Sequence, residues 1–444
     1  MPKKITIKKG LDIPLKGLAE KQCKNTGSSF YSIKPTDFVG VTPRLLVSEG
    51  DVVRIGTPLF HSKANERIKF TSPVSGTVVA VTRGEKRVIQ EIVIQTDGKG
   101  EQEFTLSRNM NDRESIITSL LIAGLWPMIR QRPYHVIANP TEEPKAIFIS
   151  GFDSAPLAPD YDFIAKDKLS QIQTGIDIFK KLTQGAVYLG LRNADSPLNG
   201  MQNVEINYFQ GPHPAGNVGT QIHHLDPLNK GEVVWTVNLL DLIIIGNYFQ
   251  SGILDFSKTI AVTGPSVLEP HYALITLGQS VQELAASNVA DGNIRFISGN
   301  VLTGSKIEKT GYMGFYDYQL TLIPEGDYYE FMGWIAPGFD KFSLSRTFFS
   351  WLAPKKKYAL NTNYHGELRN FVVTGQYEKV FPWDILPVQL LKSIIIGDIE
   401  MMENLGIYEV AEEDFALCEY VCTSKIESQQ LIRKGIEMMQ KEMS

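Results

Sequence analysis

The chain has 444 residues, of which 21% are charged, and its formal net charge is −5 at pH 7. At roughly 100–200 residues per domain, this length predicts two to four domains, and the acidic balance argues against a nucleic-acid binder. Three cysteines, Cys23, Cys418 and Cys422, are too few for a disulfide scaffold or for a cluster held by four thiolates.

No secretory signal or membrane span is predicted. The first ten residues are basic, but no apolar stretch follows them. The most apolar windows, residues 116–129 and 233–246, are shorter than the roughly 18–20 residues that cross a bilayer. We therefore expect a soluble cytoplasmic chain, which a protein partner can still hold on a membrane complex.

Residues 40–96 read as short strands with turns, as at Gly50-Asp51 and Gly56. They predict a small all-β sandwich that resembles a biotinyl/lipoyl carrier domain. Carriers hold their cofactor on a lysine at a hairpin tip. Lys63 lies in that region without the flanking residues of an attachment motif, so a structural domain is favoured over a swinging cofactor.

Strands and helices alternate from about residue 145 to 262, after a helix expected at 111–124 that Asn111 or Asp112 caps. This alternation predicts an α/β domain with a parallel sheet. The expected strands are residues 146–150, 186–190, 204–207 and 242–246, with an amphipathic helix at 169–182.

The remaining elements suggest a small α+β module followed by helices. The module has expected strands at 272–276 and 294–298 and a helix at 280–287. Helices are expected at 385–404, 412–421 and 426–443, the last with an apolar stripe of Ile432, Ile436 and Met439.

Residues 211–227 combine His213, His223, His224 and Asp226 with several glycines and prolines. Imidazoles and a carboxylate are ligands for zinc or a similar metal, but the spacing matches no standard metal motif. A structural or subunit-contact loop, a ligand contact and a metal site are therefore three open interpretations. Gly216 and Gly219 mark points where the backbone turns sharply or approaches a neighbour.

The sequence contains neither Gly-x-Gly-x-x-Gly nor Gly-x4-Gly-Lys-Ser/Thr. Because these loops cradle the phosphates of dinucleotides and triphosphates, we expect no NAD, FAD or ATP on this chain. Residues 126–135 instead join two arginines, aromatic rings and a histidine. That mixture suits a flat ligand with carbonyl oxygens, such as a quinone, or else a linker whose arginines form ion pairs.

Cys418 and Cys422 have the spacing that closes a ferredoxin-type cluster motif. Thr423 replaces the usual proline, and Glu412 and Phe415 stand where two further cysteines belong. The fragment therefore predicts the remnant of a cluster domain, with two cysteines packed on a helix.

The chain resembles the A-subunit family of bacterial Na⁺-translocating NADH:quinone reductases along nearly its whole length. The residues that carry the resemblance are 5–14, 83–87, 124–134, 211–227, 297–304, 333–337, 384–387 and 417–425. The family is similar to the C-subunit of the Rnf complex and, more remotely, to the flavin-bearing subunit of respiratory complex I. Both of those bind clusters, and this chain lacks that cysteine set.

The resemblance implies a multidomain α+β fold. It consists of an N-terminal segment with a carrier-like β barrel-sandwich (1–110), a Rossmann-like α/β domain (111–262), a β-grasp, SLBB-like module (263–330), and a linker with a C-terminal helical domain that is degenerate ferredoxin-like (331–444).

The resemblance also implies a cofactor-free subunit of a complex that oxidises NADH, reduces quinone and exports Na⁺. NADH, FAD, FMN, riboflavin and the iron–sulfur centres would belong to partner subunits. This chain would dock on membrane subunits B and D at the cytoplasmic face of the bacterial inner membrane. We expect quinone near Phe38, Arg130, Arg132, Tyr134 and His135. The alternatives are a cluster-bearing electron carrier of Rnf type and a purely structural scaffold.

Overall fold

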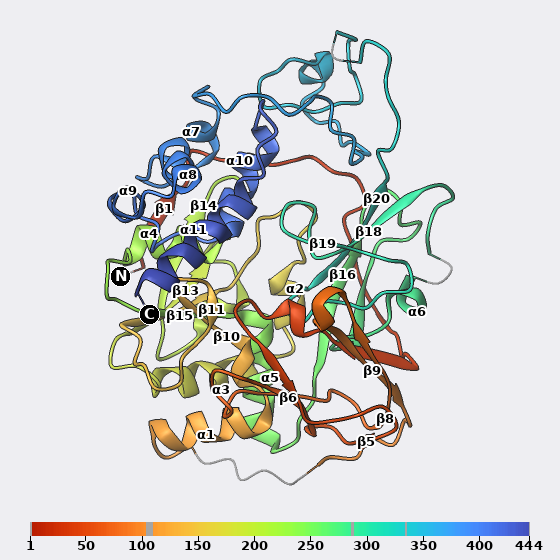
Figure 1. The fold of residues 1–444 in the computed structure, drawn as a ribbon, viewed down its shortest axis with the longest axis vertical. Helices are drawn as coiled ribbons and strands as arrows, with labels where there is room; N and C mark the ends of the chain where they lie inside the picture. Colours follow the sequence, from red (N-terminus) through yellow and green to blue (C-terminus); the bar gives the residue numbers. More distant parts are fainter. Residues whose placement is uncertain (1, 104–109, 286–287, 334, 444) are drawn as a thin grey trace.

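The computed structural model describes residues 2–103, 110–285, 288–333 and 335–443. The described strands form four sheets of seven, six, four and three strands. Figure 1 shows the barrel-sandwich strands β5, β6, β8 and β9 at the lower right, the α/β sheet to their upper left, and helices α7 to α11 beside and across the upper part of that sheet.

The N-terminal domain is a barrel-sandwich of two antiparallel sheets, ordered β3-β9-β8-β5 and β4-β6-β7. Leu59, Phe60 and Phe70 of this domain are buried, so the predicted β sandwich is confirmed. Lys63 is exposed just after β6. The strands are β3 (Phe30–Ile33), β4 (Pro43–Leu45), β5 (Val52–Val53), β6 (Pro58–Ser62), β7 (Lys69–Thr71), β8 (Gly76–Arg83) and β9 (Ile89–Thr96).

The second domain is built on the seven-stranded sheet, in the order β1-β14-β13-β12-β15-β10-β11. The first five strands in this order run parallel, whereas β10 is antiparallel to β15. The strands are β1 (Lys4–Thr6), β10 (Ile129–Arg132), β11 (Val136–Ile137), β12 (Ala146–Ser150), β13 (Ala186–Leu191), β14 (Glu205–Gln210) and β15 (Val234–Asn238).

Five helices accompany this sheet. Asp112 caps the first of them by accepting a hydrogen bond from Ser115 N, as predicted, and Gly124 ends it with φ 70°. The helices are α1 (Arg113–Ala123), α2 (Tyr161–Ala165), α3 (Leu169–Lys180), α4 (Val218–Leu225) and α5 (Leu239–Ser251).

The strand expected at residues 242–246 is wrong, because these residues lie inside helix α5. The strand of this region is β15, which ends at Asn238. The Asn238 side chain accepts a hydrogen bond from Leu240 N and so caps α5 directly where the strand stops. The single apolar run 233–246 thus contains a whole strand and most of a helix.

The third domain is a six-stranded mixed sheet ordered β19-β18-β20-β16-β17-β2. The N-terminal segment contributes β2 to this sheet and β1 to the α/β sheet. The predicted helix is confirmed over its described part, and its last positions, 286–287, lie outside the described residues. The elements are β2 (Glu20–Asn25), β16 (Ser257–Thr263), β17 (His271–Thr276), α6 (Val281–Ala285), β18 (Ile294–Ser298), β19 (Ser305–Ile307) and β20 (Gln319–Pro324).

The C-terminal part is helical, as predicted, but the single helix expected at 385–404 is wrong. Gly397, with φ 74°, ends a first helix there, and Asp398 caps a second. The expected stripe is buried, with Ile432, Ile436 and Met439 in one core with the residues of α8. The helices are α7 (Tyr377–Val380), α8 (Pro387–Ile396), α9 (Ile399–Asn404), α10 (Ala416–Val421) and α11 (Ser428–Met443), with a 3-10 helix, η6 (Glu412–Phe415), before α10. Within the described ranges, every helix is too short or too polar to cross a bilayer.

Candidate functional site

The candidate site lies where the chain reverses its direction across the α/β sheet. From β12 the chain moves outward to β13 and β14, and then returns to place β15 on the other side of β12. In open α/β sheets, ligands bind beyond the carboxyl ends of the strands at such a switch point. Ser150 ends β12 and Asn238 ends β15, and both line a cavity of about 130 Å³.

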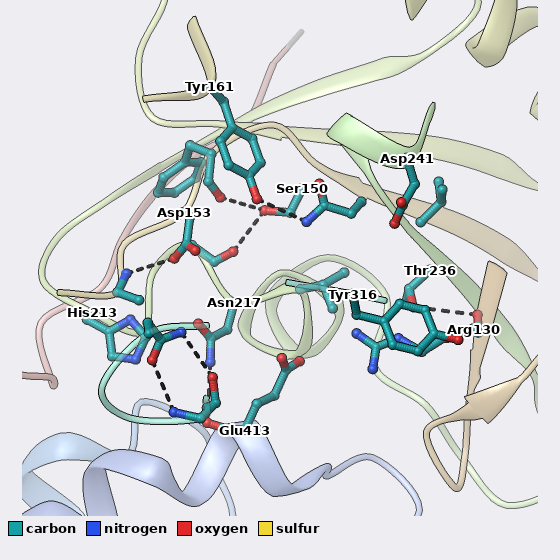
Figure 2. A pocket seen from close by; sticks show the side chains of 18 of the residues that line it. Arg130, Ser150, Asp153, Tyr161, His213, Asn217, Thr236, Asp241, Tyr316 and Glu413 are labelled. Atoms are coloured by element: carbon teal, nitrogen blue, oxygen red, sulfur yellow. Dashed lines mark hydrogen bonds between the residues drawn. The ribbon is translucent and has the colours of Figure 1, made fainter. Parts of the chain in front are cut away.

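The α/β domain, the third domain and the C-terminal helical part all contribute to this cavity. Figure 2 shows the side chains pointing into a common space from several directions. The polar and aromatic lining residues are Arg130, Ser150, Phe152, Asp153, Tyr161, His213, Asn217, Thr236, Asn238, Asp241, Asn300, Thr303, Tyr316 and Glu413.

Arg130 supplies the cation of the cavity. It lies on β10, and its guanidinium carbon stands 4.6 Å from the centre of the Tyr316 ring, a cation–π contact. The Tyr316 hydroxyl donates to the carbonyl of Pro127 at 2.7 Å, which fixes the ring in place. Figure 2 shows the guanidinium and the ring lying over one another. A flat, positively charged wall therefore borders the cavity.

Phe38 stands behind this wall rather than in it. Its ring packs edge-on against Tyr316, with the ring centres 5.8 Å apart. Phe38 also packs against Phe70 and Phe315 in a buried aromatic cluster. Since tightly packed rings resist movement, Phe38 can act on the cavity only by positioning Tyr316.

Three carboxyl groups, those of Asp153, Asp241 and Glu413, line the cavity together with Arg130. Burial raises the pKa of Asp241 to about 6, although the Tyr318 hydroxyl donates to it. Burial also raises the pKa of Asp153. Burial alone would raise the pKa of Glu413 as well, but the nearby His135, Arg132 and Arg130 outweigh it and lower that pKa. In the cavity, Glu413 is thus the ionised carboxylate, whereas Asp241 and Asp153 retain their protons more readily than exposed carboxyls do.

A hydrogen-bonded loop closes the opposite wall. The Ser154 hydroxyl lies 3.0 Å from His213 Nδ1 and accepts from Gly216 N at 2.8 Å. The Ser150 hydroxyl donates to the Gly216 carbonyl at 2.8 Å. Burial lowers the pKa of His213 to about 4, so the imidazole is neutral at pH 7 and offers a neutral face to the cavity.

The other predicted residues of the 130–135 segment lie at a joint between domains. Arg132 is fully buried and donates to Asp414 at 2.8 Å and to Glu413 at 2.9 Å. His135 Nδ1 lies 3.2 Å from Glu412, and the Tyr134 carbonyl accepts from Arg433 at 3.1 Å. These three residues tie the α/β domain to η6 and α11, and only Arg130 of the segment lines the cavity.

Glu413 connects the joint with the cavity. It accepts from Arg132 and also lines the cavity beside Arg130. Arg130 and Arg132 are two residues apart on one strand, so their side chains project from the same face. The ion pair with Arg132 therefore fixes the position of the Glu413 carboxylate in the cavity.

The side chains of the histidine-rich loop have contacts within the protein and point to different partners. His223 lies 3.1 Å from Glu409 and stacks on Trp383, whereas His224 contacts the Thr220 carbonyl and Asp226 pairs with Lys145. Among the described residues, no three His, Cys, Asp or Glu side chains gather as a metal site would require. Cys418 and Cys422 are both buried with free thiols, in or directly after α10, as expected of packed helical cysteines.

Several lining residues escape sequence reasoning. Tyr161 begins α2, Asn238 ends β15 and Asp241 lies in the first turn of α5, whereas Tyr316 and Glu413 come from other domains. The only local signal is Asn238, a capping residue followed three positions later by an acid. Chemically, the assembled site offers a cation, an aromatic face, amide and hydroxyl donors and titratable carboxyls, a set that suits a small group bearing carbonyl oxygens.

Comparison with known families gives matches along most of the chain. Residues 5–97 match the NqrA N-terminal barrel-sandwich hybrid domain, residues 111–254 the NqrA second alpha/beta domain, and residues 259–309 the NQRA C-terminal domain.

Full-length relatives agree with these matches. The A-subunit of the Na(+)-translocating NADH-quinone reductase of Pasteurella multocida is 38% identical, with 99% of this chain and 100% of that protein aligned. The proteins of the same name from Saccharophagus degradans (37% identity, 99% and 100% coverage) and Rhodopirellula baltica (38%, 98% and 98%) are equally similar. A solved NAD+-reducing [NiFe]-hydrogenase aligns at 10% identity and a TM-score of 0.37, over 74% of this chain and 61% of that one.

Proposed function

Since the chain belongs to the A-subunit family of the Na(+)-translocating NADH-quinone reductases, we propose that it works as a cofactor-free subunit of such an enzyme and contributes to its quinone site. The whole complex couples NADH oxidation and quinone reduction to Na⁺ export. In this assignment NADH, FAD, FMN, riboflavin and the iron–sulfur centres belong to partner subunits. The chain docks on membrane subunits B and D at the cytoplasmic face of the bacterial inner membrane.

The size and chemistry of the cavity support a small ligand rather than a nucleotide. Sites for drug-sized ligands enclose about 300–1,000 Å³, whereas this one measures about 130 Å³. The sequence also lacks both glycine-rich phosphate loops. A single ring with carbonyl groups is the kind of ligand that this space can receive.

The contact between Arg130 and Tyr316 is the observation on which the quinone assignment depends. A guanidinium donates strong hydrogen bonds to oxygen acceptors, and an aromatic face stacks on a flat ring. We place the quinone head against this pair, with Asn217 or Asn238 as a donor to the second carbonyl. Arg132, Tyr134 and His135 then act as positioning residues, and Phe38 supports Tyr316 from behind.

Reduction of a quinone to a quinol takes up two electrons and two protons. The electrons come from cofactors of the partner subunits. Asp241 and Asp153 are the carboxyls of the cavity that retain a proton more readily than usual, because burial raises the pKa of each, that of Asp241 to about 6. Their part is to deliver protons to the quinone oxygens, and both line the cavity that holds the head.

The test is the assembled complex carrying Arg130→Gln. Loss of one hydrogen bond from a charged donor, worth about 1.5–3 kcal/mol, should raise the KM for ubiquinone-1 about tenfold or more. NADH oxidation by ferricyanide, which bypasses the quinone, should stay unchanged. Arg44→Gln is the matched control, since Arg44 lies on the exposed surface. An unchanged quinone KM would favour the purely structural scaffold.

A further inference from the structure

A long segment between β20 and α7 lies at the outside of the molecule. We call residues 328–333 and 335–373 the aromatic segment. Apart from η5 (Phe349–Leu352), its described residues form neither helix nor regular strand. Figure 1 shows this stretch of chain standing out beyond the sheets at the top of the view. Connections longer than about 12–15 residues without secondary structure are uncommon in compact domains and are usually functional or disordered.

The aromatic segment exposes an unusual number of large apolar side chains. Tyr329 and Phe331 have relative exposures of 105% and 94%, so the described part of the chain leaves them uncovered. A single exposed apolar side chain is normal, but a concentration of them marks an interaction surface. The other exposed members are Tyr328, Met332, Ile335, Phe339, Phe349, Trp351, Leu352, Tyr364, Leu368, Val372 and Val373.

Internal contacts hold the segment in a defined shape. Lys341 Nζ donates to Glu330 and to the Gly333 carbonyl. Lys356 Nζ donates to Asp340 at 2.6 Å and to the Phe339 carbonyl at 3.0 Å. These bonds present Phe331, Phe339 and their neighbours at set positions, as a recognition loop does.

The segment also carries a net positive charge in an acidic chain, with six Lys or Arg residues against Glu330, Asp340 and Glu367. Residues 342–366 contain Arg346, Lys355, Lys356 and Lys357 and no Asp or Glu. The two preceding acids, Glu330 and Asp340, are paired with Lys341 and Lys356. Arg346, Lys355 and Lys357 are exposed beside the apolar side chains. A partner must therefore offer both apolar area and negative charge.

A groove of about 860 Å³ continues this surface into the body of the protein. Its walls are the aromatic segment, strands of the six-stranded sheet of the third domain, and residues 419–426. Arg295, Lys306, Arg369 and Lys425 line it among apolar side chains such as Leu302 and Phe342. Five Lys or Arg side chains and three acidic ones, Glu330, Asp340 and Glu419, line the groove, so it combines apolar groups with a net positive charge, as the segment beside it does.

We propose that the aromatic segment and this groove form one docking surface for an apolar, acidic surface on another chain of the same complex. The proposal deepens the proposed function and rests on it. A second copy of this chain would bring cationic segments face to face, which is unfavourable. Aromatic and arginine side chains that are held in place fit the pockets of a protein partner. A fluid bilayer has no such pockets, so it does not require side chains at set positions.

The experiment uses the purified full-length chain and inverted membrane vesicles from a strain that makes every other subunit of the complex but not this one. Wild-type chain should bind these vesicles saturably and restore NADH:quinone reduction. Phe331→Ser and the double variant Lys355→Glu/Lys357→Glu should each weaken binding about tenfold, as hot-spot residues do. Val52→Ser and Lys8→Glu/Lys9→Glu change equally exposed residues elsewhere and should bind like wild type.

Three results would overturn the docking surface. The first is unchanged binding of both variants. The second is wild-type binding of equal strength to vesicles from a strain without the complex or to phosphatidylglycerol liposomes, which would make the bilayer the partner. The third is salt-sensitive self-association in sedimentation that Phe331→Ser abolishes. If the wild-type chain binds but never restores quinone reduction, the proposed function fails while the docking surface stands.

Discussion

Arg132 on β10 and Asp414 on η6 form an ion pair with 2.8 Å between Nη1 and Oδ2, and both side chains are buried. The pair joins the α/β domain to the C-terminal helical part across 282 positions of sequence. Arg132 Nη1 also donates to the Glu409 carbonyl at 2.8 Å. Because the neighbouring Glu413 lines the cavity, the same joint that holds the domains together also shapes the candidate site.

Replacement of Arg132 by Met should be strongly destabilising. Removing one partner of a buried ion pair leaves the other charge uncompensated, which costs about 3–5 kcal/mol. Urea unfolding of the purified chain measures this loss. The double variant Arg132→Met/Asp414→Leu should regain part of it, because the Asp414 charge is removed while Glu413 still lacks the arginine that it pairs with. A single variant as stable as wild type would show that the pair does not hold the joint.

Gly219, near the start of α4, is predicted to be indispensable for this pair. A Cβ at position 219 would lie 2.5 Å from Asp414 Oδ1 and 2.6 Å from Arg132 Nη1. Gly219→Ala should therefore lower the free energy of unfolding by about 1–3 kcal/mol through overpacking. Gly200→Ala is the control, because a Cβ there meets nothing within 4 Å. Equal stability of the two variants would contradict the close approach.

Asp241 should make stability depend on pH. Burial raises its pKa from 3.8 to about 6, so the stability that the group contributes is fully present below about pH 4 and is lost as the pH rises through 6. Asp241→Asn removes this dependence. Between pH 4 and pH 8, the unfolding free energy of the variant should gain about 3 kcal/mol relative to wild type. A constant difference would show that Asp241 titrates normally.

His213 should make the free energy of unfolding depend on pH in the opposite direction over the same pH range. Burial lowers its pKa from 6.5 to about 4, so its contribution to stability is present above about pH 6.5 and is lost as the pH falls toward 4. The His213→Gln variant should lose most stability, compared with wild type, at pH 7. At pH 4 the difference between their free energies of unfolding should be smaller by about 3 kcal/mol. A gap that widens on acidification would mean that the buried imidazole is charged.

Local patterns predicted the elements well wherever periodicity and a cap coincide. Helix α1 is an example, with Asp112 at its start and Gly124 at its end. The expected strand at 242–246 failed because residues 233–246 form one apolar run, and a buried strand and a buried helix have the same composition. Asn238, which caps α5, is the residue that divides the run.

The site was only partly accessible from the sequence. Arg130 could be selected because an arginine in an aromatic segment is conspicuous, but Tyr316, Asp241 and Glu413 reach the same cavity from distant parts of the chain. Local sequence patterns do not predict which residues from distant parts of the chain will line the same cavity. Arg132 and Arg130 look alike in the sequence, and only the fold separates a cavity residue from a buried ion pair.

The most direct test of the quinone assignment is a density map of the assembled complex with quinone bound. We predict ring density in the cavity beyond β12 and β15, within hydrogen-bonding distance of Arg130 and stacked on or beside Tyr316. A quinone ring bound elsewhere, with no atom of this chain in contact, would contradict the assignment.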